Sequence, residues 1–203
     1  MQPASDELLL AEFANLQARL NAVGAEVTST AALAQFEPSP AAQRVLARAL
    51  SASQHHLLRE FIARALTEPK LERDVFAALV AAFEDELHPI ARWAIGNAVA
   101  TAATNEDVDK LLELVSESGY GIGRQMIVLR LERWAREQRV DDVLISLTHD
   151  EDVYGHAATA LGGAASQRAL DALDPLMTCE RKWIQTAARK SAARVEKRLT
   201  RGK

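Results

Sequence analysis

Cysteine is almost absent from this sequence of 203 residues, because Cys179 is the only one. A single cysteine excludes an intramolecular disulfide and a thiolate metal cluster, and it is compatible with a reducing compartment. Aromatic residues are also few, at 5% of the chain, although 48% of all residues are hydrophobic. The apolar content is therefore mostly alanine and leucine, which suits closely spaced helices better than a sheet core.

Long hydrophobic runs and a strong excess of one charge are missing too. No segment approaches the roughly 20 apolar residues that a membrane-spanning helix needs, and the N-terminal stretch MQPASDELLLAEF lacks the basic region of a signal peptide. The 24 basic and 28 acidic residues give a formal net charge of −4, so no global attraction to nucleic acid or to an anionic membrane is expected. These absences predict a cytoplasmic protein without a membrane segment.

Local motifs of catalysis and metal binding are absent as well. The sequence has no GxSxG, HExxH or EF-hand pattern, and its GYGIG string lacks the preceding strand that a nucleotide-binding glycine loop needs. His55 and His56 are adjacent, so we expect them to point to different faces of one helix. We therefore expect no enzyme, no metal and no cofactor, although catalytic residues that converge from distant segments would leave no local motif.

What the sequence does contain is a helical period over almost its full length. Apolar residues recur at three- and four-residue spacing from Leu8 onward to Leu199, and no alternating strand pattern appears. Helix starts are expected where a capping residue precedes a proline or an acidic residue. These positions are Ser39, Glu68, His88, Asn105 and Asp150. The pattern predicts an all-α chain of about a dozen helices.

Four stretches look like successive versions of one helix. They are PIARWAIGNAVATAA, GIGRQMIVLRLERWA, DVYGHAATALGGAAS and KWIQTAARKSAARVE. The equivalent positions Ile90, Ile122, Val153 and Ile184 recur at a period of about 32 residues, and Leu58 lies one period before the first of them. One helical pair cannot bury its apolar face alone, so this period predicts stacked pairs. We expect a single domain over residues 1–203, with an N-terminal helical cap over 5–36 and about five stacked helical pairs over 39–199.

Several strings also resemble a known repeat family. HDEDVYGHAATALG, ALDALDPLM and KWIQTAARKSAARV resemble the consensus of bacterial HEAT-like repeats of the phycobilisome-lyase type. The order RWAIGNAV, YGIGRQM, DVYGHAATALG is similar to a group of small bacterial HEAT-repeat proteins, over Glu84 to Val195. The resemblance implies a right-handed α-α superhelix, a HEAT-like solenoid, in which the helix carrying the A-L-G string lines the concave side. Gly155 and Gly163 depart from the residue types that the generic repeat usually has there.

The candidate binding site is a row of side chains on this repeated helix. Measured from Ile90, taken as a core residue, Arg92 lies about 200° around the helix and Trp93 about 300°. We therefore expect Arg92 to point away from the core and Trp93 to flank it. The same interval separates Arg92 from Arg124 and Arg124 from His156. If the repeats are aligned on their core residues instead, His156 corresponds to Trp93, because Ile122 to Val153 is one residue shorter. The candidate partner-binding residues are Arg92, Trp93, Tyr120, Arg124, Gln125 and His156.

The residue types in this row suit an acidic or carboxylate-bearing partner segment, because arginine binds carboxylates in a bidentate manner and aromatic residues dominate many interfaces. The alternative is that each arginine pairs with acidic residues of the next repeat, such as Glu132 or Asp152. The sequence thus predicts a non-catalytic scaffold or adaptor that binds a protein or peptide partner on its concave face.

Nucleic-acid binding is the alternative function. The three tryptophans invite comparison with DNA base-repair proteins built from HEAT-like repeats, and the run Arg181–Lys203 is densely basic. The net charge weighs against this interpretation, because such a protein needs many phosphate contacts. The basic run also suits the polar end that a terminal repeat requires.

Overall fold

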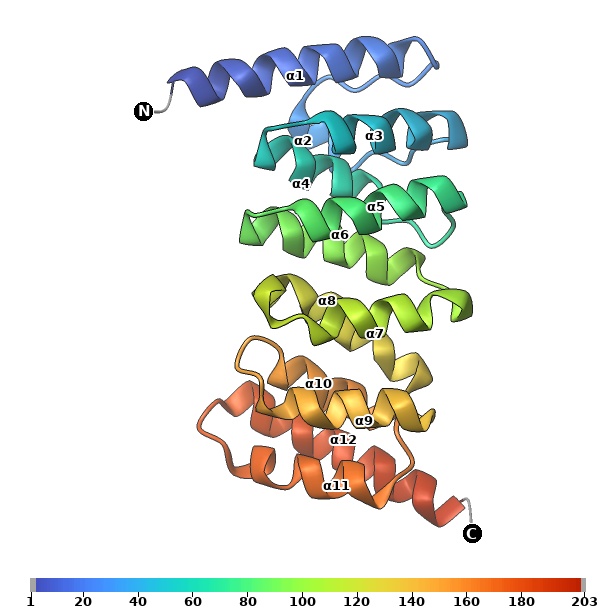
Figure 1. The fold of residues 1–203 in the computed structure, drawn as a ribbon, viewed down its shortest axis with the longest axis vertical. Coiled ribbons are helices and arrows are strands. Elements are labelled where there is room, and N and C mark those ends of the chain that lie inside the picture. The colour runs from blue at the N-terminus through green and yellow to red at the C-terminus, as the bar shows by residue number, and fades with distance from the viewer. Residues whose placement is uncertain (1–2, 202–203) are drawn as a thin grey trace. The chain divides into compact units, whose positions relative to one another are not determined.

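The computed structural model describes residues 3–201, and within this range it contains helices and connecting turns but no β-strand. The expected all-α class is confirmed, with twelve α-helices and short 3-10 helices between them (Figure 1). The chain forms two compact units, and the boundary between them falls between Thr104 and Asn105. No helix of the described residues is both long enough and apolar enough to cross a membrane.

The first unit contains six α-helices, of which the last four form two pairs (Figure 1). Their bounds are α1 (Pro3–Asn21), α2 (Thr30–Leu33), α3 (Pro40–Ala52), α4 (His56–Ala65), α5 (Arg73–Asp85) and α6 (Pro89–Ala102). α3 pairs with α4 and α5 with α6, and the two pairs stack because α3 contacts α5 and α4 contacts α6. α1 packs against α3 and α4, and α2 packs against α4. Leu46, Ile62 and Phe83 are fully buried in this core.

The second unit repeats the paired arrangement, and most of its helices continue into a 3-10 turn. Its α-helices are α7 (Val108–Ser116), α8 (Gln125–Arg130), α9 (Gln138–Ser146), α10 (Tyr154–Ala160), α11 (Gln167–Leu173) and α12 (Lys182–Arg201). The 3-10 helices are η1 (Asn105–Asp107), η2 (Ser118–Arg124), η3 (Leu131–Trp134), η4 (Leu147–His149), η5 (Leu161–Gly163) and η6 (Pro175–Thr178). α8, α10 and α12 contact one another in succession, and so do α7, α9 and α11.

Alanines allow the helices of one row to lie close together. Ala157, Ala158 and Ala160 of α10 are fully buried, and α10 contacts both α8 and α12. In the first unit, Ala94 and Ala98 of α6 are buried, and α6 contacts α4. Because alanine has no side chain beyond Cβ, helix axes can approach to the short end of the usual range of roughly 8–10 Å.

The helix starts follow the expected capping residues in part. Ser39 Oγ accepts from the backbone N–H of Ala42 at 3.4 Å and caps α3, and His88 precedes α6 as expected. The expected start at Glu68 is wrong, because α5 begins at Arg73 after an irregular segment. The expected start at Asp150 is also early, because the Asp150 carboxylate accepts from the backbone of Asp152 in a turn that precedes α10.

Candidate functional site

Arg92, the first arginine of the expected row, is an internal residue of the first unit. It is 9% exposed, and its Nε donates to the carbonyl oxygen of Phe83 at 3.2 Å. Phe83 lies in the last turn of α5, where carbonyl groups have no donor within their own helix. The expectation that Arg92 points away from the core is therefore wrong. Its reference residue was unsuitable, because Ile90 lies in the first turn of α6 and is 47% exposed, while Ile95 is fully buried.

Arg124 makes the equivalent contact in the second unit. Its Nη1 donates to the carbonyl oxygen of Val115 at 3.1 Å, and in both units the acceptor lies nine residues before the arginine. Val115 belongs to the last turn of α7. Nε of Arg124 donates to the Gly121 carbonyl at 3.1 Å, and Nη1 lies 2.8 Å from Asp150 Oδ2. Arg124 is 1% exposed, so its Nε and Nη1 are engaged inside the protein, and they tie the start of α8 to the end of α7.

The arginine pattern stops at Gly155, which occupies the corresponding position of the next helical pair. The indole of Trp183, from α12, fills the space that a side chain would take: a Cβ on Gly155 would lie 2.1 Å from Cη2 of Trp183. Trp183 is nevertheless 52% exposed. A position that holds a buried arginine in two helical pairs thus supports a half-exposed tryptophan in the third.

A pocket of about 290 Å³ opens beside this tryptophan. We call it the Trp183 pocket. It is lined by Ile122, Gln125, Glu151, Asp152, Tyr154, Gly155, His156, Arg181 and Trp183. These residues come from η2, the first turns of α8 and α10, the turn before α10 and the start of α12. The stacked helices α8, α10 and α12 therefore bring their N-terminal ends to one site.

Two of the expected site residues, Gln125 and His156, line the Trp183 pocket. The His156 ring meets the Trp183 indole edge to face, with ring centroids 5.8 Å apart and an interplanar angle of 64°. Burial lowers the pKa of His156, so its imidazole is neutral near pH 7. Gln125 Nε2 donates to the carbonyl oxygen of Asp152 at 2.9 Å, which ties α8 to the turn before α10.

Charged groups of both signs surround the indole. The Asp152 side chain is 49% exposed, and its Oδ2 lies 3.8 Å from Nη2 of Arg124. Glu151 is exposed beside it. The Arg181 guanidinium, which also lines the pocket, lies over the Tyr154 ring, 5.4 Å from its centroid. Aromatic surface with a few polar groups around it can hold an apolar or aromatic side chain and hydrogen-bond the chain that carries it.

The remaining expected site residues, Trp93 and Tyr120, do not line this pocket. Trp93 is half-buried on α6 in the first unit. Tyr120 is half-buried in η2, beside Gly121, whose φ of 52° lies in the left-handed region that favours glycine. The expected row is thus divided between the two units, and the structure brings together Gln125 and His156.

Sequence reasoning missed Trp183, Tyr154 and Arg181 as site residues. Gly155 could have indicated them. It stands where the two preceding repeats have Arg92 and Arg124, and a glycine there leaves a space that another side chain must fill. The acidic turn from Asp150 to Asp152 was expected only to cap a helix. Asp150 does serve the structure by pairing with Arg124, but Asp152 also lines the pocket.

Three histidines in the first unit also differ from expectation. The rings of His55 and His56 stack with centroids 5.1 Å apart, and those of His56 and His88 stack at 4.0 Å. Adjacent residues point the same way here because His55 precedes α4 in an extended conformation and is not part of the helix. Within the described residues, no group of three or more histidine, cysteine, aspartate or glutamate side chains is arranged to hold a metal ion.

Comparison of the chain with known proteins finds no matching family model, no matching curated protein and no matching solved structure. The geometry of the Trp183 pocket is therefore the basis for a functional proposal.

Proposed function

We propose that this protein is a non-catalytic HEAT-like scaffold that binds a peptide or protein partner through the Trp183 pocket. The observation that carries the proposal is the half-exposed indole packed on Gly155, at a distance that leaves no room for a Cβ. Tryptophan, tyrosine and arginine are enriched among the few residues that supply most of the binding energy at protein interfaces, and all three types line this pocket.

The architecture of the proposal is a right-handed solenoid of stacked helical pairs. Pairing of successive helices within each unit, and contact between helices of the same row, support it. In such a solenoid, the row of α8, α10 and α12 presents its side chains along one surface. A peptide that lies across the N-terminal ends of these helices would reach Gln125, His156 and Trp183 together.

The chemistry of the partner follows from the charges at the pocket. An acidic partner was expected because of Arg92 and Arg124, but the structure buries both side chains. The accessible carboxylates are those of Glu151 and Asp152, with Arg181 held against Tyr154. We therefore propose a partner segment that places an apolar or aromatic side chain on Trp183 and donates hydrogen bonds to the two carboxylates.

Selection from a random peptide library tests this function. Peptides selected on the wild-type protein should bind Trp183→Ala at least about tenfold more weakly, because the substitution removes the aromatic surface. Leu87→Ala is the matched control, since Leu87 is an exposed hydrophobic residue of the first unit and lies outside the pocket. Equal affinity of the selected peptides for both variants would contradict the proposal.

The alternative proposal is nucleic-acid binding through the basic helix α12. The arginines of this helix make internal contacts in the second unit: Arg189 donates to the Met177 carbonyl, Arg194 pairs with Glu132, and Arg198 donates to the Gly162 carbonyl. These contacts favour a role for the basic residues in holding α12 to its neighbours. They do not involve every basic residue of α12.

A further inference from the structure

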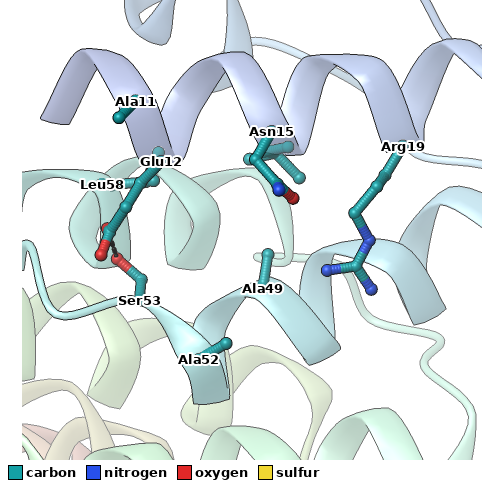
Figure 2. Close-up of a pocket in the computed structure, with 9 residues that line it drawn as sticks. Ala11, Glu12, Asn15, Arg19, Ala49, Ala52, Ser53 and Leu58 are labelled. Carbon is teal, nitrogen blue, oxygen red and sulfur yellow. Dashed lines mark hydrogen bonds between the residues drawn. The ribbon is translucent and has the colours of Figure 1, made fainter. Parts of the chain in front are cut away.

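A second pocket, of about 340 Å³, lies in the first unit between α1 and α3 (Figure 2). Its walls are Ala11 and Asn15 on α1 and Ala49 and Ala52 on α3, and Leu58 of α4 closes its base. We call it the α1–α3 groove. It shares no residue with the Trp183 pocket.

Small residues create this groove. Ala11 and Asn15 are four residues apart on one face of α1, and Ala49 and Ala52 are three residues apart on α3. Short side chains therefore line both helices over about one helical turn. Beneath them, Leu58 is almost fully buried and provides an apolar base. The result is a slot with apolar walls and the volume of a small ligand site.

The carboxylate of Glu12, at one end of the groove, already accepts hydrogen bonds from the protein itself. Glu12 accepts hydrogen bonds from Ser53 Oγ at 2.5 Å and from the backbone N–H groups of Gln54 at 2.9 Å and His55 at 3.4 Å. These donors precede α4, where a carboxylate also interacts favourably with the helix dipole. The charge of Glu12 is therefore compensated within the protein, and Figure 2 shows its side chain turned to Ser53.

The guanidinium of Arg19, at the other end, has no comparable hydrogen-bond partner among the residues that the structure describes. Arg19 lines the groove, and its guanidinium makes no hydrogen bond or ion pair with any residue that the structure describes. It lies seven residues after Glu12 on α1, which is about 10 Å along the helix axis. Asn15 stands between them and adds an amide group (Figure 2). The groove thus combines an apolar slot with one uncompensated cation at its end.

We propose that the α1–α3 groove binds a small monocarboxylate with an aliphatic chain. The chain lies against Ala49, Ala52 and Leu58, and the carboxylate binds the Arg19 guanidinium, whose planar fork matches two carboxylate oxygens. The Asn15 amide donates to the same head group. An aliphatic amine is a poorer ligand for this groove, because the Glu12 carboxylate already accepts three hydrogen bonds within the protein.

Calorimetric titration of the full-length protein with octanoate, octanol and octylamine tests this site. Octanoate should bind at least about tenfold more tightly than octanol or octylamine, as expected for a charge-assisted hydrogen bond to arginine. Arg19→Gln should reduce octanoate affinity to that of octanol, and Arg19→Lys should retain part of it. Equal binding of octanoate and octanol, or unchanged binding of octanoate to Arg19→Gln, would overturn the proposal.

Filling the groove gives a second test. Ala52→Leu should abolish octanoate binding, because the added side chain occupies the space of the aliphatic chain. Ala14→Leu is the matched control, since Ala14 is exposed on the same helix as Arg19 and does not line the groove. Circular dichroism melts verify that both variants fold. Octanoate binding that survives Ala52→Leu, or a peptide with a C-terminal leucine that binds the groove more tightly than octanoate, would contradict the assignment of a small aliphatic ligand.

Discussion

At the scale of single residues, the position of a side chain's donors decides whether an arginine serves the fold or a ligand. Arg92 and Arg124 have the residue type and spacing of a binding row, yet each donates to a carbonyl in the last turn of the preceding helix. Their long side chains reach back to a residue of the helix before, which a helical wheel does not represent. The residue that does remain accessible is Trp183, because Gly155 leaves the space for it.

Removal of the Arg124 side chain tests its structural role. Arg124→Met should lower the free energy of unfolding by about 2–4 kcal/mol, because it leaves two backbone carbonyls and Asp150 without their donor. Urea unfolding measures this change. Arg139→Met is the matched control, since Arg139 forms an exposed ion pair with Asp109 and should contribute little. Equal stabilities of the two variants would refute the structural role.

A methyl group at Gly155 tests how Trp183 is held. Gly155→Ala should displace the indole, because the new Cβ would lie 2.1 Å from Cη2 of Trp183. The Nε1–H resonance of Trp183 should then shift in a nitrogen–proton spectrum, and affinity for selected peptides should fall at least about tenfold. Gly119→Ala is the control, because an added Cβ there meets only the Glu117 carboxylate, at 3.2 Å. An unshifted Trp183 resonance would show that the glycine is not required.

At the scale of helices, the ends carry most of the chemistry of this chain. The Trp183 pocket lies at the starts of three helices, and the α1–α3 groove begins where Glu12 accepts hydrogen bonds from Gln54 and His55, just before α4. The histidine stack also joins two helix starts, because His55 and His56 stand at the start of α4 and His88 precedes α6.

The histidine stack makes stability depend on pH. Burial lowers the pKa of His56 below 6.5, the charges of His88 and His55 lower it further, and Glu86 and Glu60 oppose the shift. The unfolded chain therefore binds more protons than the folded protein as the pH falls. The stabilising contribution is complete above the ordinary pKa of 6.5 and is lost as the pH drops through and below it.

Urea unfolding at about pH 7.5 and about pH 5.5 measures this effect. The wild-type protein should lose stability between the two values. His56→Gln should lose less, because it lacks the imidazole that binds a proton more readily in the unfolded chain than in the folded protein. His149→Gln, which lies outside the stack, should behave as the wild type. An equal pH-dependent loss for His56→Gln and the wild type would exclude His56 as the source.

At the scale of the whole chain, the sequence predicts the helical class and the pairing of helices well. Both follow from the spacing of apolar residues and from the regular recurrence of one helix sequence, which are visible without coordinates. The orientation of α6 could not be predicted, because Ala91 and Ala100 lie on opposite sides of the helix and are both buried, so the helix has no single apolar face that defines the core. The site depends on contacts between residues as far apart as Gly155 and Trp183, and a single sequence does not show these.

The net charge of −4 gives a prediction for nucleic acid. Because binding to phosphates requires several unpaired basic residues, we expect no mobility shift of single- or double-stranded DNA or RNA even at low salt. A shift that weakens steeply as salt rises, and that is lost in Lys197→Gln and Arg201→Gln, would instead support the alternative function.

Chemical-shift mapping with a selected peptide tests the central proposal most directly. The peptide should perturb the indole Nε1–H of Trp183 and the side-chain amide of Gln125, which line the pocket, and leave the indole of Trp134, which donates to Asn105, unchanged. Perturbation of Trp93 with an unchanged Trp183 would contradict the proposal and place the binding site in the first unit.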